Sequence, residues 1–343
     1  MTCSEQLSAK ISNMSFVCAV LVVYIHVGVS GEPDSLEWWL KNSVAEGISR
    51  IAVPFFFLIA GFFIAPHIGE RGWWFQSLQK RVRTLLLPMV IWSVTYGTIS
   101  TFLKIVSNVQ AGRLVDLSAF LSWTNLLVWC GMDLTTSPSL FPMWFVRCLF
   151  LLVALTPFVN YFLQRSSVIF LLGLFIISSF LYWISIPDPI GYVLGFVLSL
   201  SGILYYSVGI LLFYSRNKVD GLRWLTYKTG IPSLCIGLLL ICLYLAGFVR
   251  LDLRPIFVPF VLFGVWFLIP SGKWKISRYS FLIYVLHPFW LLFLAYGSRW
   301  MVAIPATWQF VGRGLLAVVL SIVSAVVIQR VSPRGYVLLF GGR

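Results

Sequence analysis

The sequence alternates between long apolar segments and short polar loops, and this pattern constrains the fold more than any other feature. A helix crosses a hydrocarbon core of about 30 Å with roughly 20 apolar residues. About ten segments approach that length: 12–30, 48–65, 84–104, 142–163, 167–185, 190–214, 225–248, 255–270, 278–297 and 309–330. The pattern therefore predicts an all-α integral membrane protein, a bundle of about ten transmembrane helices.

The composition favours a bilayer over water as the surroundings of these helices. Only 10% of the 343 residues are charged, 59% are hydrophobic, and the mean hydropathy is +0.93, whereas soluble domains have roughly a quarter charged residues. The sequence has no internal repeat and no long linker, so residues 1–343 are expected to form a single domain. The apolar run after Lys10 lacks a small-residue cleavage site, and we interpret it as the first membrane helix rather than a signal peptide.

The basic residues indicate the orientation of the helices. The net charge of +14 does not indicate nucleic acid, because Lys and Arg lie in short groups between apolar segments. With a cytoplasmic N-terminus, most of the 25 Lys and Arg residues fall in cytoplasmic loops, as the positive-inside rule requires. This distribution predicts an even number of spans with both termini in the cytoplasm. The apolar stretch 117–130, in the longest loop, is expected to form an interfacial helix.

Two of the three histidines lie within predicted spans, where ionisable side chains are costly and mark candidate functional sites. His26 lies roughly 20 Å into the first helix, past the midplane, and His287 lies near mid-depth of a later helix. A neutral imidazole can accept a proton from a hydroxyl group, which is the task of a general base. For each histidine the alternative is a structural hydrogen bond to a neighbouring helix.

A polar notch is expected around the second of these histidines. Ser280, Tyr284 and His287 are spaced i, i+4, i+7 and share one helical face. Pro288 cannot donate to the carbonyl of Tyr284, and a freed carbonyl within a bilayer is tolerated where it lines a cavity. The alternative is a polar seam that packs two helices together.

Two arginines are expected near the outer ends of their helices. Arg147 follows Pro142 at the start of the fourth segment, where its guanidinium needs an anion, a carbonyl group or water. Arg50 begins the second segment, and an interfacial anchor is the alternative for it. Together with His26 and His287, these arginines are predicted to face one cavity in the central and outer bilayer.

The cysteines give no sign of a metal site. Six are scattered through the sequence, and they form neither a CxxC pair nor a Cys/His cluster with zinc-ligand spacing. We expect them to be packing residues, with no metal site and no bound cofactor.

Five segments resemble, in the same order, signatures of the acyltransferase-3 family of bacterial integral membrane O-acyltransferases. These segments are ISNMSFVCAVLVVYIHVG, RIAVPFFFLIAGFFI, KRVRTLLLPMVIWSVTY, PMWFVRCLF and SFLIYVLHP. The resemblance runs nearly end to end, and the first segment ends in the position of the family's catalytic histidine, here His26. One position departs: the family usually has an arginine eleven residues before this histidine, where Ser15 stands.

The resemblance implies transfer of an acyl group, most often acetyl, across the bacterial cytoplasmic membrane. Acyl-CoA would be the co-substrate, and a hydroxyl group of a glycan or lipid-linked sugar would be the acceptor. His26 would act as the catalytic base or carry the acyl group, and Arg147 or Arg50 would stabilise the oxyanion. The residues expected to bind the donor or line the tunnel are Lys80, Arg81, Arg83, Trp144, Ser280, Tyr284 and His287.

Two alternatives remain open from the sequence. A transporter or flippase for a glycan or lipid intermediate is one, because His and Arg in a cavity also suit the passage of an anion. A catalytically inactive family member is the other, because Ser15 cannot supply the charge of the usual arginine. Binding of acyl-CoA from the cytoplasmic side would distinguish a transferase from both. The acceptor, the acyl group and the oligomeric state are left open, with lipids but no nucleic acid as further expected partners.

Overall fold

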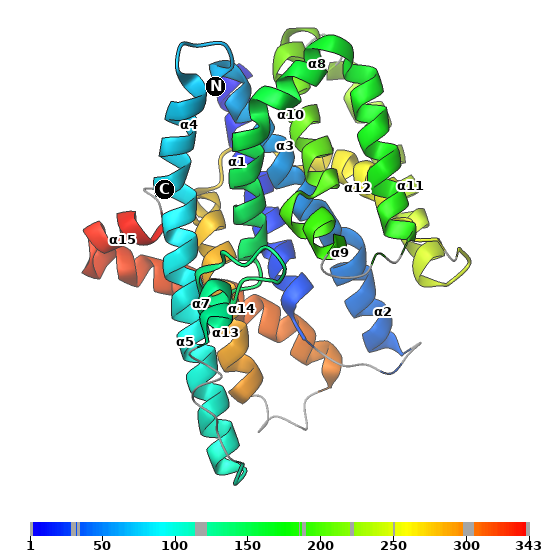
Figure 1. The fold of residues 1–343 in the computed structure, drawn as a ribbon. Coiled ribbons are helices and arrows are strands. Elements are labelled where there is room, and N and C mark those ends of the chain that lie inside the picture. The colour runs from blue at the N-terminus through cyan, green and yellow to red at the C-terminus, as the bar shows by residue number, and fades with distance from the viewer. Residues whose placement is uncertain are drawn as a thin grey trace. The chain divides into compact units, whose positions relative to one another are not determined.

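The computed structural model describes residues 3–28, 32, 35–113, 122–184, 186, 190–219, 223–249, 251–297 and 305–340. Every regular element within these ranges is helical (Figure 1). The α-helices are α1 (Cys3–His26), α2 (Leu36–Asn42), α3 (Ala52–Ile64), α4 (Trp73–Arg81), α5 (Leu87–Gln110), α7 (Trp123–Cys130), α8 (Met143–Trp183), α9 (Ile190–Tyr192), α10 (Leu200–Val219), α11 (Arg223–Leu245), α12 (Arg254–Leu268), α13 (Ser280–Gly297), α14 (Ala306–Val331) and α15 (Pro333–Phe340). Short 3-10 or π segments join several of them: η1 (Ser43–Gly47), η2 (Ile48–Ile51), η3 (Ala65–His67), η4 (Val82–Leu86), η5 (Val193–Val197) and η7 (Lys275–Tyr279).

Each predicted membrane segment overlaps one or more helices among the described residues. Seven helical runs among the described residues are long and apolar enough to cross a membrane. The longest, Met143–Trp183, has an extended backbone at Ser166 (φ −162°, ψ 84°), close to the boundary predicted between the fourth and fifth segments. Thr229–Leu245 and Arg254–Leu268 are apolar but shorter. The predicted all-α membrane class is therefore confirmed for the described residues.

The loop between α5 and α8 contains a short helix, as the apolar stretch 117–130 predicted. α7 begins after Ser122, whose hydroxyl accepts a hydrogen bond from the N–H of Asn125, a typical N-cap. The helix ends at Gly131, which has the left-handed φ of 71° that glycine adopts without strain. Helix is thus confirmed for Trp123–Cys130, and residues 117–121 of the prediction lie outside the described residues.

The chain divides into two compact units, each assembled from segments that are far apart in the sequence. Unit 1 comprises Met1–His67, Leu163–Ile184 and Ser201–Val327, and unit 2 comprises Ile68–Phe162, Ser185–Leu200 and Ile328–Arg343. In unit 1, α1 packs against α3 and α13, and α11 packs along α12. In unit 2, α5 packs against α7 and α15.

A buried asparagine fixes the register between α1 and the loop before α13 in unit 1. The amide Nδ2 of Asn13 donates to the carbonyls of Pro270 (3.0 Å) and Gly272 (2.6 Å), and its Oδ1 accepts from the N–H of Trp274 (3.0 Å). The hydroxyl groups of Ser12 and Ser277 lie 2.7 Å apart beside it. These bonds satisfy an amide with no exposed surface, and they hold α13 at a defined height along α1.

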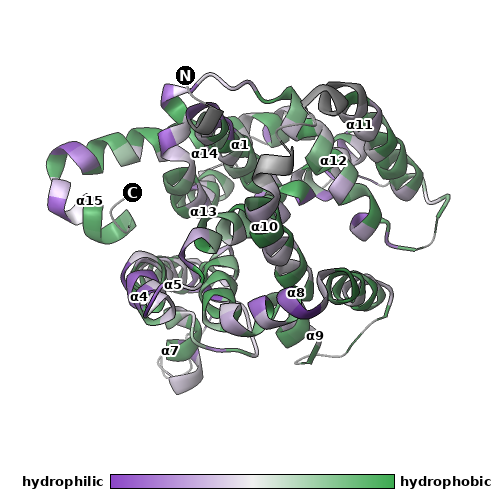
Figure 2. Cartoon of the chain, turned by 90° about the horizontal axis from the view of Figure 1, so that it is seen from above, coloured by the Kyte–Doolittle hydropathy of each residue, from purple (hydrophilic) through white to green (hydrophobic). Residues whose placement is uncertain are grey.

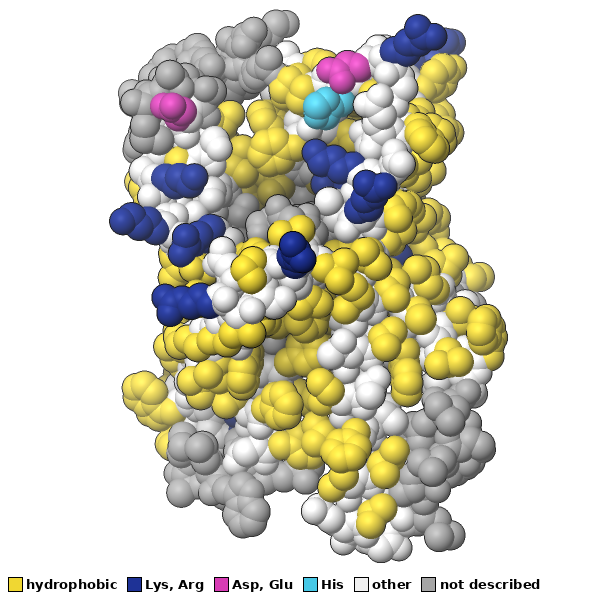
Figure 3. All heavy atoms as spheres, turned by 90° about the vertical axis from the view of Figure 1, so that its left-hand side faces the viewer, with side chains coloured by type: hydrophobic (Ala, Val, Ile, Leu, Met, Phe, Trp, Pro, Cys, Tyr) yellow, Lys and Arg dark blue, Asp and Glu magenta, His cyan; other side chains and the backbone are white. Residues whose placement is uncertain are grey.

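The outward-facing side chains suit a hydrocarbon solvent. On α14, the side chains of Leu315, Val319, Val323 and Val327 are each just over half exposed, and their spacing of four residues places them on one face. Hydrophobic residues predominate along the described helices (Figure 2). One space-filling face shows hydrophobic side chains over much of the described surface, with Lys and Arg more frequent than Asp and Glu (Figure 3). Such continuous apolar surface indicates contact with lipid rather than water.

Candidate active site

Two of the predicted site residues meet in unit 1, at the contact between α1 and α13. The imidazole rings of His26 and His287 are stacked, with centroids 5.5 Å apart and planes inclined by 27°. His26 is the last residue of α1 and is partly accessible, whereas His287, in the middle of α13, has no exposed surface. The structure therefore brings together two of the four residues that were predicted from the sequence to face one cavity.

The ring of His287 is oriented by its own helix. Its Nδ1 lies 3.0 Å from the carbonyl oxygen of Ile283, one turn earlier. The following residue, Pro288, lies inside the helix and cannot donate a hydrogen bond to the carbonyl of Tyr284. The Nε2 atom of His287 is buried and has no hydrogen-bond partner within the part of the chain that the structure describes. A notch of polar groups thus interrupts an otherwise apolar helix.

Arg50 lies in the same unit and belongs to a network of ion pairs. Its guanidinium bonds to Glu46, one turn earlier, with Nε 3.1 Å and Nη2 2.5 Å from Oε2. Arg254 lies 3.7 Å from the same carboxylate oxygen and also pairs with Asp252. Arg50 is close enough to His26 for its positive charge to act on that imidazole. This network holds a cation near the histidine pair.

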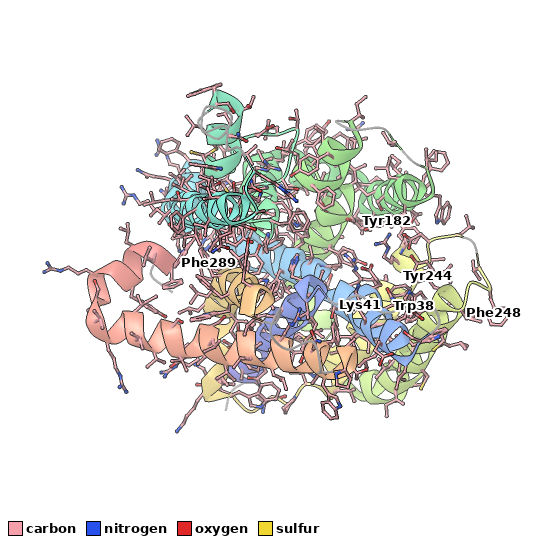
Figure 4. The ribbon with its side chains drawn as sticks, turned by 90° about the horizontal axis from the view of Figure 1, so that it is seen from below. Trp38, Lys41, Tyr182, Tyr244, Phe248 and Phe289 are labelled. Carbon is pink, nitrogen blue, oxygen red and sulfur yellow. The ribbon has the colours of Figure 1, made fainter. Side chains whose placement is uncertain are left out.

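Aromatic side chains border this ion-pair network. The guanidinium of Arg254 lies 5.2 Å from the ring centre of Tyr182, a cation–π distance. Tyr244 of α11 interacts electrostatically with the same charged groups. Figure 4 labels both tyrosines, together with Trp38 of α2, in a view from below. Glu46, Asp252 and Arg254 were not predicted from the sequence, although the spacing of four residues between Glu46 and Arg50 is the signal of a pair on one helical face.

Tyr284 and Ser280 occupy the face of α13 that the sequence assigned to them. The ring of Tyr284 is buried and lies 6.4 Å from the ring of His287. The hydroxyl of Ser280 donates to the carbonyl of Ser277 at 2.5 Å, so it caps the preceding turn. Of these two residues, Tyr284 is the one in contact with the histidine pair.

Arg147 and Trp144 belong to unit 2. The Arg147 side chain is 4% exposed, and its guanidinium donates to the carbonyls of Gly131 (3.3 Å) and Asp133 and to the hydroxyl of Tyr192 (2.7 Å). Carbonyl groups are among the partners predicted from the sequence for the guanidinium of Arg147. Trp144 packs edge-to-face on Phe196 with ring centres 5.0 Å apart. Arg147 thus orders the loop between α7 and α8, whereas Trp144 packs against η5.

Asp133 stabilises the loop that accepts hydrogen bonds from Arg147. The stability of this loop is therefore expected to fall at acidic pH. The Asp133 carboxylate accepts from Oγ1 (2.7 Å) and N–H (2.7 Å) of Thr135 and from Oγ1 of Thr136 (3.0 Å). These hydrogen bonds, chiefly from the Thr135 hydroxyl, lower the pKa of Asp133. A lowered pKa gives stability that is present above about pH 4 and lost as pH falls through the folded-state value.

Replacing Asp133 with alanine is therefore expected to cost about 1 kcal/mol near neutral pH and less at pH 3. Thermal melting of the purified protein at both pH values measures the difference. Thr136→Val, which removes one hydroxyl and keeps the carboxylate, is the matched control and should retain most of the pH dependence. An equal cost of Asp133→Ala at both pH values would contradict this account.

The basic residues assigned to the donor lie at the end of α4 and in η4, within unit 2. Lys80 and Arg83 are exposed, and Arg81 is partly buried. In unit 1, the hydroxyl of Ser15 donates to the carbonyl of Ile11 (2.8 Å), an ordinary bond within its helix. The nearest basic residue toward the start of α1 is Lys10, whose Nζ lies 5.0 Å from the ring centre of Trp266.

The described residues contain no group of three or more His, Cys, Asp or Glu side chains arranged to hold a metal ion. The side chains at and near the histidine pair present imidazole, guanidinium and hydroxyl groups. These groups suit proton transfer and nucleophilic attack at a carbonyl carbon.

Comparisons with known proteins agree with the resemblance seen in the sequence. A family model for acyltransferase-3 proteins, described as an acyltransferase domain, matches residues 10–330. The succinoglycan biosynthesis protein ExoH of Rhizobium meliloti (strain 1021) is 25% identical over 186 residues, which cover 49% of this chain. The match covers 46% of ExoH, so the chain aligns with about half of that relative. No solved structure matches significantly.

Proposed function

Because the chain belongs to the acyltransferase-3 family, we propose that it transfers an acyl group from acyl-CoA to a hydroxyl group of a glycan or lipid-linked sugar. The observation that carries the proposal is the stacked pair of His26 and His287 inside the matched region. The His26 side chain is partly accessible, and the His287 side chain is fully buried. Imidazoles in such surroundings suit acyl transfer by base or nucleophilic catalysis.

The proposed chemistry uses the cation beside the histidines. A thioester carbonyl gains negative charge on its oxygen as it is attacked, and a positioned cation stabilises that oxyanion. Arg50 is held by Glu46 near His26, so it fits this role better than an arginine free to rotate. Arg147, the other predicted candidate, already donates to two carbonyls and a tyrosine hydroxyl. We therefore assign stabilisation of the oxyanion to Arg50 and the ordering of the loop between α7 and α8 to Arg147.

The donor is proposed to be acetyl-CoA, bound from the cytoplasm. The phosphates of CoA need cations, and Lys80, Arg81 and Arg83 present three within four residues of α4 and η4. Lys10, at the start of α1, is a candidate to supply the charge that Ser15 lacks. These residues lie at ends of helices that the loop charges place on the cytoplasmic side.

The proposed topology is ten spans with both termini in the cytoplasm of a bacterial inner membrane. Seven long helical runs become ten spans when Met143–Trp183 is divided at Ser166 and when α11 and α12 are counted. Shorter helices are accommodated where the bilayer thins or where protein covers their ends. The proposed acceptor follows the name of the ExoH relative, which refers to the biosynthesis of a glycan.

The test is turnover of radiolabelled acetyl-CoA by the purified protein in lipid nanodiscs. We expect release of free CoA thiol, with water as acceptor, and transfer of label to a cell-envelope glycan fraction when that fraction is added. A transporter would bind or move the glycan without consuming acetyl-CoA. Absence of both CoA release and saturable donor binding would reject the proposal and favour an inactive family member.

A further inference from the structure

His287, the second histidine of the pair, has one buried ring nitrogen, Nε2, that makes no hydrogen bond to the described residues. His287 has no exposed surface; its Nδ1 lies 3.0 Å from the carbonyl oxygen of Ile283, and its Nε2 has no hydrogen-bond partner among the described residues. Buried polar atoms are almost always paired, so a buried nitrogen without a partner calls for an explanation. If His287 served only to hold two helices together, its Nε2 would be expected to form a hydrogen bond with a neighbouring helix.

The hydrogen bond at Nδ1 decides which nitrogen carries the proton. A carbonyl oxygen can only accept, so Nδ1 must be the N–H donor to Ile283. Adding a second proton at Nε2 would leave an unpaired cation in the interior of a membrane protein, which is much more costly than a neutral ring. The ring is therefore neutral, and Nε2 presents an unused lone pair.

The stacked arrangement keeps that lone pair available. The ring planes of His26 and His287 are inclined by only 27°, and nitrogen lone pairs lie in the ring planes. The two rings are therefore nearly parallel, and Nε2 of His287 makes no hydrogen bond to the ring of His26. A hydroxyl group that reaches Nε2 would meet an unused lone pair next to the ring of His26.

From this geometry we infer that His287 is a second catalytic residue: Nε2 removes the proton of the acceptor hydroxyl while His26 carries the acyl group. The inference rests on the proposed function and adds a role to each ring. The accessible ring of His26 suits contact with the donor, whereas the buried ring of His287 suits a base kept neutral until the acceptor arrives.

The two half-reactions balance without any further reactant. In the first, a ring nitrogen of His26 bonds to the thioester carbonyl carbon, the C–S bond breaks, and the CoA thiolate takes the proton that the His26 ring releases. In the second, the acceptor oxygen bonds to the acyl carbon as its proton passes to Nε2 of His287. The C–N bond to His26 then breaks, and the proton on His287 returns to the His26 ring.

The experiment separates these half-reactions in nanodiscs, with radiolabelled acetyl-CoA and with water as the acceptor. The main variant is His287→Asn, because the asparagine amide can still donate to the carbonyl of Ile283 but has no group at the position of Nε2. It is expected to keep the initial burst of CoA release and the label on the protein, and to lose steady-state turnover about 100-fold or more. His67→Asn, at an exposed histidine in η3, is the matched control and should turn over normally.

His287→Gln is a second variant in case His287→Asn does not fold. Its amide group lies near the position of Nε2 but cannot take up a proton. Thermal melting identifies the variants that are folded. Normal turnover of either folded variant would overturn the inference, and so would loss of the burst together with turnover. A wild-type protein that neither binds acetyl-CoA nor releases CoA would reject the proposed function itself. An active wild type with an equally active His287 variant would instead reject only the role of His287.

Discussion

Replacing His26 with alanine is expected to abolish acyl transfer while the protein remains folded in the membrane. His26 ends α1, where its ring is partly accessible and stacks on His287, so the substitution removes little packing. A general base alone contributes about 10²- to 10⁴-fold to a rate, and loss of an acyl carrier removes both half-reactions. We therefore expect neither a burst of CoA release nor labelled protein, and turnover reduced by about 10³-fold or more.

The measurement is release of CoA thiol from acetyl-CoA by wild type and variant at equal concentration in nanodiscs. His67→Ala, at an exposed histidine, is the matched control and should retain the wild-type rate. Binding of acetyl-CoA should persist in His26→Ala, because the basic residues proposed for the phosphates are unchanged. A His26→Ala protein with wild-type turnover would remove His26 from the mechanism and leave His287 as the only histidine of the pair to consider.

The helices were predictable because the bilayer limits the choices that an apolar segment has. A chain in hydrocarbon must satisfy its backbone within each segment, so run length alone locates the helices. Helix ends were less predictable: α1 begins at Cys3, well before the predicted residue 12. Its first turns contain polar residues such as Glu5 and Lys10, and a helix can continue into the interface without an apolar signal.

The histidine pair was predictable only in part. Depth along each helix placed His26 past the midplane and His287 near mid-depth, but depth carries no information about which helical faces meet. That depends on Asn13, which fixes α1 against the loop at Pro270–Trp274 through backbone carbonyls that no sequence pattern marks. The predicted sharing of one cavity with Arg147 remains a prediction, since Arg147 belongs to unit 2.

The ion pairs around Arg50 show the same limit. Glu46 was within reach of local reasoning, because residues four apart face each other on a helix. Asp252 precedes α12 and Arg254 is its first residue, far from Glu46 in the sequence, and pairing between such distant charges follows from tertiary packing. The tautomer of His287 could likewise not be predicted from the sequence, because it depends on the distance between Nδ1 and the carbonyl oxygen of Ile283.

The crossing of α3 and α10 in unit 1 is expected to be the most sensitive packing contact in the protein. A Cβ added at Gly209 would lie 1.9 Å from the carbonyl oxygen of Leu58, and one added at Gly61 would lie 2.0 Å from that of Tyr206. Atoms this close cannot be relieved by a side-chain rotation, because the obstacle is backbone. Small residues at such crossings let helices approach, which is a main source of stability within a bilayer.

Gly209→Ala is therefore expected to separate the two helices and to destabilise unit 1 by about 3 kcal/mol or more. Gly173→Ala is the matched control: Gly173 lies within α8, a Cβ there would meet nothing within 4 Å, and alanine favours helix. Thermal melting in the same detergent should show a large loss for Gly209→Ala and none for Gly173→Ala. Since α3 directly follows η2, which contains Arg50, Gly209→Ala should also lower acetyl-CoA turnover in the protein that remains folded. Equal stability of the two variants would mean that α3 and α10 do not cross as closely as these backbone distances require.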